Sequence, residues 1–198
     1  MRLFVALDLP EGVRETIVAW GRRVLGEAPA VRLLAPESLH VTLCFLGSQP
    51  ASQVDRIAAV CGLAAAFPAP RLSLARAVWL PRRRPRVLAV ELEDRLGTLG
   101  ELQSALSDRL SAAGWYQAER RRFLPHVTIA RVARSAPPLA APPLAAPLAA
   151  LSDPPRADFA GPRVTLYRSR LQPGGARYEA LGSVALSDVG RPAPRMRY

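Results

Sequence analysis

The sequence has 198 residues, of which 49% are hydrophobic and 22% charged, so we expect one globular domain with a sizeable core. The formal net charge is +11 and all 27 basic residues are arginine, which favours a polyanionic partner such as nucleic acid. Coding bias in a GC-rich genome is the alternative source of so much arginine. Two cysteines exclude a disulfide framework. The apolar run near residue 1 is too short for a signal peptide or membrane span, so we expect a cytoplasmic protein.

The first half of the chain alternates between strand and helix patterns. A helical stripe is formed by Val13, Ile17, Trp20 and Val24, and Gly26 ends it. A shorter helical pattern begins near residue 52 and places Cys61 in the core. We expect strands over 3–7, 31–34, 39–46 and 72–80.

In the second half, Asp94 is suited to cap a helix whose apolar stripe starts at Leu96 and ends before Gly114. We expect strands over 87–92, 126–132, 164–171 and 178–186. Residues 135–156 are rich in alanine and proline and predict an extended loop. Residues 190–198 predict a loose tail.

The chain's only two histidines each open the same four-residue pattern. The first copy is His40-Val41-Thr42-Leu43, and the second is His126-Val127-Thr128-Ile129. Residues two apart in a strand share a face, so each copy would present a histidine and a threonine together. A strand and then a helix precede each copy at similar spacing, which predicts two related lobes that each offer one histidine.

Two imidazoles facing one cleft can deliver one proton while removing another. Displacement at phosphorus needs both transfers, and the Thr42 and Thr128 hydroxyls with a nearby arginine would hold the phosphate oxygens. One alternative is that the histidines are satisfied buried groups. Another is a zinc site of His40, Cys44 and His126, because strict alternation puts Cys44 on the histidine face.

Both motif copies lie in longer runs that resemble a known family. These are the opening run 2–7, His40-Val41-Thr42-Leu43-Cys44-Phe45-Leu46-Gly47, Pro125-His126-Val127-Thr128-Ile129-Ala130-Arg131, and the closing run 164–169 with Tyr178-Glu179. They are similar to the two-histidine phosphoesterase superfamily, and more narrowly to the RNA 2′,3′-cyclic phosphodiesterases that were historically called 2′-5′ RNA ligases. The resemblance implies an α+β fold of two pseudo-symmetric lobes. Each lobe would be an antiparallel sheet backed by helices, with the active site in the cleft between them.

The resemblance also implies roles for individual residues. His40 would donate a proton to the leaving ribose 3′-oxygen and His126 would accept one from water, although the residues alone leave these two roles interchangeable. Thr42, Thr128 and Arg131 would bind phosphate, with a surface charge as the alternative for Arg131. Phe45 could stack on a base, but strict alternation takes it off the histidine face and favours core packing. Cys44 departs from the family, whose members often carry a larger, frequently basic residue there.

The expected function is metal-independent hydrolysis of RNA 2′,3′-cyclic phosphate ends to 2′-phosphates, possible in reverse as weak 2′-5′ ligation. We expect no cofactor, no metal, no membrane association, and a monomer without an obligate protein partner. The arginine runs 82–86 and 120–122 could follow an RNA backbone or be solvated loop charges. Two other functions stay open: a cyclic phosphodiesterase of small nucleotides, and a non-catalytic RNA-binding module.

Overall fold

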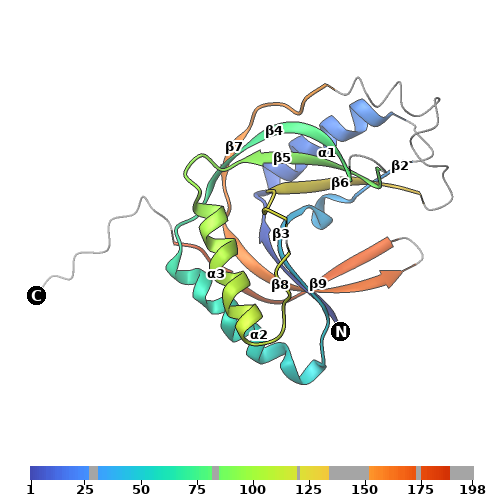
Figure 1. Cartoon of the computed structure of the whole chain (residues 1–198). Helices are drawn as coiled ribbons and strands as arrows, with labels where there is room; N and C mark the ends of the chain where they lie inside the picture. Colours follow the sequence, from blue (N-terminus) through green and yellow to red (C-terminus); the bar gives the residue numbers. More distant parts are fainter. Residues whose placement is uncertain (27–30, 82–84, 120, 134–151, 173–174, 188–198) are drawn as a thin grey trace, which may run out of the picture.

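The computed structural model describes residues 1–26, 31–81, 85–119, 121–133, 152–172 and 175–187. Across these residues the strands form one nine-stranded antiparallel sheet with three α-helices (Figure 1). The helices are α1 (Glu11–Leu25), α2 (Val54–Cys61) and α3 (Thr98–Ala112). The strands are β1 (Arg2–Asp8), β2 (Val31–Leu33), β3 (His40–Ser48), β4 (Arg71–Leu80), β5 (Val87–Glu93), β6 (His126–Val132), β7 (Asp158–Ala160), β8 (Arg163–Gln172) and β9 (Gly175–Ala185).

The sheet has two halves that meet at the motif strands. Its order is β7-β4-β5-β6-β3-β1-β8-β9, with β2 added beside β6. In the described residues, the strands β3 and β6 are in register at one pair only, Val41 with Val127. The predicted α+β fold with two lobes is confirmed, and the two antiparallel sheets are the halves of one continuous, curled sheet.

Helices α1 and α3 each follow the first strand of a strand–helix–motif unit. Each packs on the opposite half of the sheet from that strand. Helix α1 follows β1 but contacts β2 and β6, whereas α3 follows β5 but contacts β3. In Figure 1, α1 lies by the half that contains β4, β5 and β6, and α2 and α3 lie by the other half. This exchange ties the two halves together through one core, which includes Val41 and Val127 at 0% exposure.

Helix α3 begins later than the sequence predicts. Gly97 adopts a left-handed φ of 73°, and the helix starts at Thr98. Leu96 therefore precedes the helix and is 71% exposed, whereas Leu99 is fully buried. The Asp94 side chain still accepts a hydrogen bond from the Gly100 amide at 3.0 Å, so it supports the first turn from further back.

The short strand β7, which pairs with β4, was not predicted, because three residues carry too little alternation to reveal a strand. Of the predicted loop 135–156, only residues 152–156 are described, and they have no regular structure. The Trp20 indole donates a hydrogen bond to the Ser152 carbonyl at 3.2 Å, which fixes this end of the loop to α1. Residues 82–84, Arg120 and the predicted tail 190–198 lie outside the described residues. Among the described helices, none is long and apolar enough to cross a membrane.

Candidate active site

A β-bulge in each motif strand decides which side chains face the site. In β3, Leu43 and Cys44 are both buried, and the register with β1 shifts by one residue between the pairs Val5–Cys44 and Ala6–Thr42. The bulge reverses the alternation from Cys44 onward. Phe45 therefore lies on the face of His40 and Thr42, where it is 57% exposed.

The second motif strand repeats this irregularity. Ile129 and Ala130 are both buried, and the register of β6 with β5 shifts between Leu88 and Ala89. Arg131 is thereby exposed on the face of His126 and Thr128. Phe45 and Arg131 are equivalent positions in the two halves, each five residues after its histidine.

The bulge also corrects the prediction that Cys44 shares the histidine face. Cys44 is 1% exposed and lies within the hydrophobic core, and burial raises the pKa of its thiol to about 12. A neutral thiol on the opposite face of the sheet cannot complete a zinc site with the two histidines. Cys61 is a core residue, as predicted. In the described part of the chain, no group of three or more histidine, cysteine or acidic residues is arranged to hold a metal ion.

Both histidines are oriented by the same backbone contact. The Nδ1 of His40 donates to the Ser38 carbonyl at 2.8 Å, and the Nδ1 of His126 donates to the Leu124 carbonyl at 2.8 Å. A carbonyl can only accept, so a neutral imidazole in either place has its free nitrogen at Nε2. The Nε2 of His40 lies 3.1 Å from the Thr42 hydroxyl. Each motif thus turns Nε2 toward the site.

The antiparallel pair Val41–Val127 brings the two motifs together. In an antiparallel pair, the residue before Val41 faces the residue after Val127, so His40 comes beside Thr128, and Thr42 comes beside His126. Both valines point into the core, so the histidines and threonines share the opposite face.

The pKa of His40 reflects its burial and the charges around it. It is lowered from 6.5 to about 4, mainly by burial, and the positive charges of Arg131 and His126 act in the same direction. The hydrogen bond to Ser38 and the negative charge of Asp8 oppose this shift. His40, His126 and Arg131, which come from two halves of the sheet, therefore interact electrostatically within one site.

Three aromatic rings that sequence reasoning did not assign to the site surround His40. Phe4 lies 4.9 Å from the His40 ring centroid, and Tyr178 meets His40 edge-on at 5.2 Å. Tyr167 stacks on Phe4 at 5.3 Å. Both tyrosines belong to the closing run of the sequence, but only the order β3-β1-β8-β9 brings that run beside His40.

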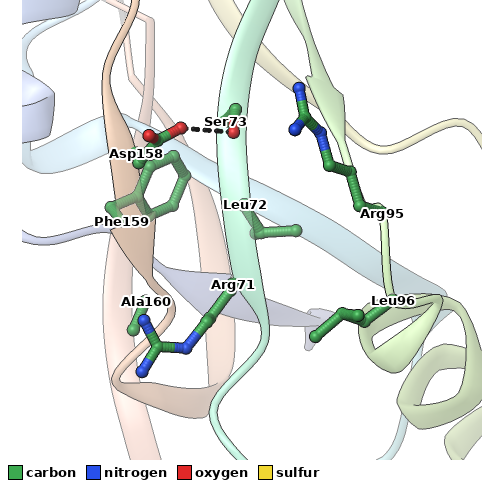
Figure 2. A pocket seen from close by; sticks show the side chains of 8 residues that line it. All are labelled: Arg71, Leu72, Ser73, Arg95, Leu96, Asp158, Phe159 and Ala160. Carbon is green, nitrogen blue, oxygen red and sulfur yellow. Dashed lines mark hydrogen bonds between the residues drawn. The ribbon is translucent and has the colours of Figure 1, made fainter.

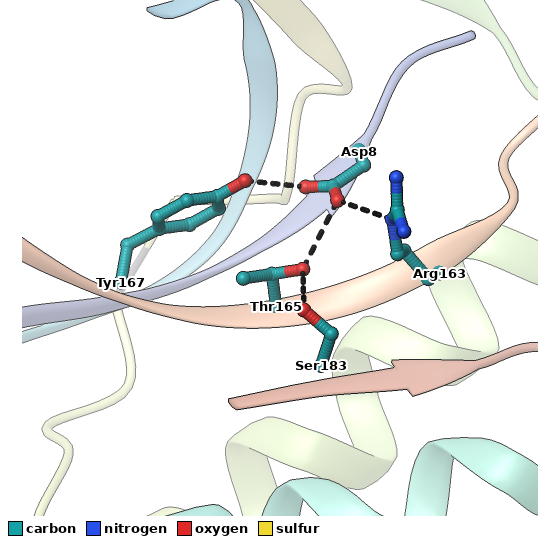
Figure 3. Close-up of polar contacts among 5 residues, drawn as sticks. All are labelled: Asp8, Arg163, Thr165, Tyr167 and Ser183. Atoms are coloured by element: carbon teal, nitrogen blue, oxygen red, sulfur yellow. Dashed lines mark hydrogen bonds and ion pairs between the residues drawn. The ribbon is translucent and has the colours of Figure 1, made fainter. Parts of the chain in front are cut away.

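Asp8 anchors Tyr167, one ring of this aromatic cluster (Figure 3). It is paired in register with His40, and it accepts hydrogen bonds from the Tyr167 hydroxyl at 2.9 Å and the Thr165 hydroxyl at 3.0 Å. An ion pair with Arg163 at 2.8 Å completes its contacts. Burial raises the pKa of Tyr167 to about 12, together with the charge of Asp8 and the hydrogen bond from Tyr167 to Asp8. The Tyr167 hydroxyl therefore stays a donor.

A separate surface pocket of about 420 Å³ lies at the β4–β7 edge of the sheet (Figure 2). Arg71, Arg95, Leu96 and Phe159 are among its lining residues, and no residue of either motif lines it. Arg95 is ion-paired with Glu93 at 3.1 Å. The histidine face and this pocket are therefore different places on the molecule.

Comparison with known proteins gives one consistent family. Residues 13–172 match the model of the 2′-5′ RNA ligase superfamily. The chain is 31% identical over 190 residues to the RNA 2′,3′-cyclic phosphodiesterase of Escherichia coli, covering 94% of this chain and 97% of the relative. It is 32% identical over 198 residues to the protein of the same name from Thermus thermophilus, covering 94% and 90%. The solved structure of Escherichia coli LigT complexed with 3′-AMP superposes with a TM-score of 0.75 at 28% identity, covering 94% of this chain and 98% of LigT.

Proposed function

Because this chain belongs to the 2′-5′ RNA ligase superfamily, we propose that it hydrolyses the 2′,3′-cyclic phosphate ends of RNA to 2′-phosphates. The observation that supports this most directly is the antiparallel pair Val41–Val127, which puts one histidine and one threonine from each motif on a common face. The proposed enzyme works without a metal or other cofactor, as a cytoplasmic monomer.

The proposed phosphate site is made by the hydroxyls of Thr42 and Thr128 and the guanidinium of Arg131. Hydroxyl and guanidinium donors match the non-bridging oxygens, on which negative charge increases in the transition state. Arg131 is exposed on the histidine face and makes no ion pair within the described residues, so its charge is available to an anion. Phe45 lies on the same face and offers an exposed ring on which the terminal base stacks.

In the proposed reaction, the Nε2 of His126 removes a proton from water as its oxygen attacks phosphorus. The bond from phosphorus to the ribose 3′-oxygen breaks, and the Nε2 of His40 gives that oxygen a proton. The product carries a 2′-phosphate, His126 ends protonated and His40 neutral, and exchange with solvent restores the starting state. If a 5′-hydroxyl takes the place of water, the same steps form a 2′-5′ linkage, which is disfavoured because water is in large excess.

His40 must hold a proton to act as donor, whereas burial keeps its pKa at about 4 in the free protein. The negative charge of a bound cyclic phosphate favours the imidazolium, as does the nearby Asp8 carboxylate. Substrate binding therefore protonates the donor in this scheme. The Nδ1 hydrogen bond to Ser38 is compatible with both protonation states, so the ring need not turn.

The test is incubation of a short RNA ending in a 2′,3′-cyclic phosphate with the protein in EDTA, with identification of the product end. We expect conversion to a 2′-phosphate. A protein that is inert in EDTA and active with zinc would point to metal chemistry. A protein that is inert in both but binds RNA would be a non-catalytic binder. Activity on cyclic mononucleotides alone would make it a small-nucleotide phosphodiesterase.

A further inference from the structure

A second arginine lies next to Arg131 on the histidine face. Strand β2 pairs with β6 so that Arg32 is directly opposite Arg131. Residues opposite each other in an antiparallel pair project to the same face, with Cβ atoms ~4.5–5.5 Å apart. Val31 and Leu33, on either side, pack against the core, which confirms that Arg32 points to the other face.

Two guanidinium groups on neighbouring strands and on one face give this part of the face a concentrated positive charge. Such a charge attracts an anion that contacts both groups, or two linked anions that contact one each. RNA offers the second arrangement, because the nucleotide with the cyclic phosphate is joined through its 5′-oxygen to another phosphate. The arginine pair therefore matches two successive phosphates of one strand.

The far half of the sheet determines where the Arg32 guanidinium lies. Gly175, at the start of β9, has a left-handed φ of 116°, and a Cβ there would lie 2.8 Å from Cζ and 2.9 Å from Nη1 of Arg32. The glycine thus lets the start of β9 approach the Arg32 guanidinium. In Figure 1, β2 and the adjoining ends of β8 and β9 lie on the same side of the molecule.

We propose that Arg32 binds the phosphodiester immediately upstream of the cyclic phosphate and thereby selects oligonucleotides over cyclic mononucleotides. This inference rests on the proposed function and adds a second phosphate subsite to it. Arg131 holds the reacting phosphate, Arg32 holds the next one, and Gly175 leaves room for the Arg32 guanidinium.

The test compares three substrates: adenosine 2′,3′-cyclic phosphate, the same nucleotide with a 5′-phosphate, and a diadenosine ending in the cyclic phosphate. The readout is the ratio of kcat/KM with the upstream phosphate to kcat/KM without it. We expect Arg32→Ala to lower this ratio about tenfold for both phosphorylated substrates, as expected for one contact between charged groups. Arg32→Lys should retain part of the preference for the substrates with an upstream phosphate. Arg23→Ala, which replaces an exposed arginine on α1, should leave the ratio unchanged.

Salt dependence gives a second readout. For the diadenosine, the slope of log kcat/KM against log salt should become shallower by about 0.7 in Arg32→Ala, because one phosphate contact to a single strand is lost. An unchanged ratio and slope would overturn the subsite while leaving the proposed function intact. An equal loss on all three substrates would also overturn it, since Arg32 would then act on the reacting phosphate or on folding. If the wild type hydrolyses none of the three, the proposed function itself fails.

Discussion

Val41 and Val127 are paired antiparallel, and in the described part of the chain theirs is the single register pair that joins the two halves of the sheet. Both side chains are fully buried, and each is flanked by the histidine and threonine of its own motif. The same pair therefore closes the core on one face and assembles the proposed active site on the other. Because the two motifs meet at their centres, each histidine comes beside the threonine of the other motif.

The bulge at Leu43 and Cys44 exposes Phe45 on the histidine face, where it is the proposed base-stacking residue, instead of burying it in the core. Phe45→Ala should raise the KM for RNA cyclic phosphate ends about 5- to 150-fold, since stacking on one base contributes about 1–3 kcal/mol. The free energy of unfolding should change by less than about 0.5 kcal/mol, because the ring is exposed. Steady-state kinetics and urea denaturation measure the two effects. Leu96→Ala, an exposed apolar residue in the other pocket, should change neither.

Burial of neutral His40 should make stability depend on pH. The pKa of His40 is about 4 in the folded protein and about 6.5 when unfolded, so between these values the unfolded chain binds more protons. The contribution of neutral His40 to the free energy of unfolding is fully present above about pH 6.5 and is lost as the pH falls toward 4. At pH 5 the loss amounts to about 2 kcal/mol. Urea denaturation of wild type and His40→Gln, at pH 5 and at a pH above about 6.5, measures this loss. An equal loss of stability in both proteins would contradict the burial of His40 as its cause.

Asp8 should raise the pKa of His40, since its carboxylate is the negative charge that opposes the effects of Arg131 and His126. Asp8→Asn removes that charge and leaves Arg163 without its ion-pair partner, so the pKa of His40 should fall below the wild-type value. NMR titration of the two imidazoles measures it directly. Asp108→Asn, on the exposed face of α3, is the matched control. A pKa that stays the same or rises in Asp8→Asn would contradict the electrostatic role.

The leaving group distinguishes the proton donor from the acceptor. A phosphodiester with a nitrophenyl leaving group needs little help from an acid, because nitrophenolate is a stable anion. His40→Ala should therefore lose much less activity on this ester than on the RNA cyclic phosphate, whereas His126→Ala should lose activity on both. The inverse pattern would assign the donor role to His126. A pH profile alone cannot decide, since both assignments give the same bell-shaped curve.

The sequence predicts most elements because their apolar spacing is regular, as in α1 and in the two motif strands. The bulges cannot be predicted from strict alternation, which assumes that successive side chains always point to opposite faces of the strand. A signal is nevertheless present, because the last residue of each motif and the residue that follows it are both apolar, as in Leu43-Cys44 and Ile129-Ala130. These pairs are both buried, and only a bulge permits that in a strand with one exposed face.

The surroundings of His40 could not be predicted, because they depend on long-range register. Phe4 and Tyr167 are 163 residues apart and meet because β1 pairs with β8. Nothing near Asp8 in the sequence indicates that it would accept hydrogen bonds from residues of β8. The pairing of Arg32 with Arg131 is equally invisible, because β2 has only three residues.

The central claim is that the two histidines act as one catalytic unit, and a double-mutant cycle tests it most directly. Wild type, His40→Ala, His126→Ala and the double variant are assayed by single turnover on a short RNA 2′,3′-cyclic phosphate in EDTA. We expect each single variant to be slowed about 100-fold or more, and the double variant to be little slower than either. Losses that multiply in the double variant, or a single variant that keeps wild-type activity, would contradict the account.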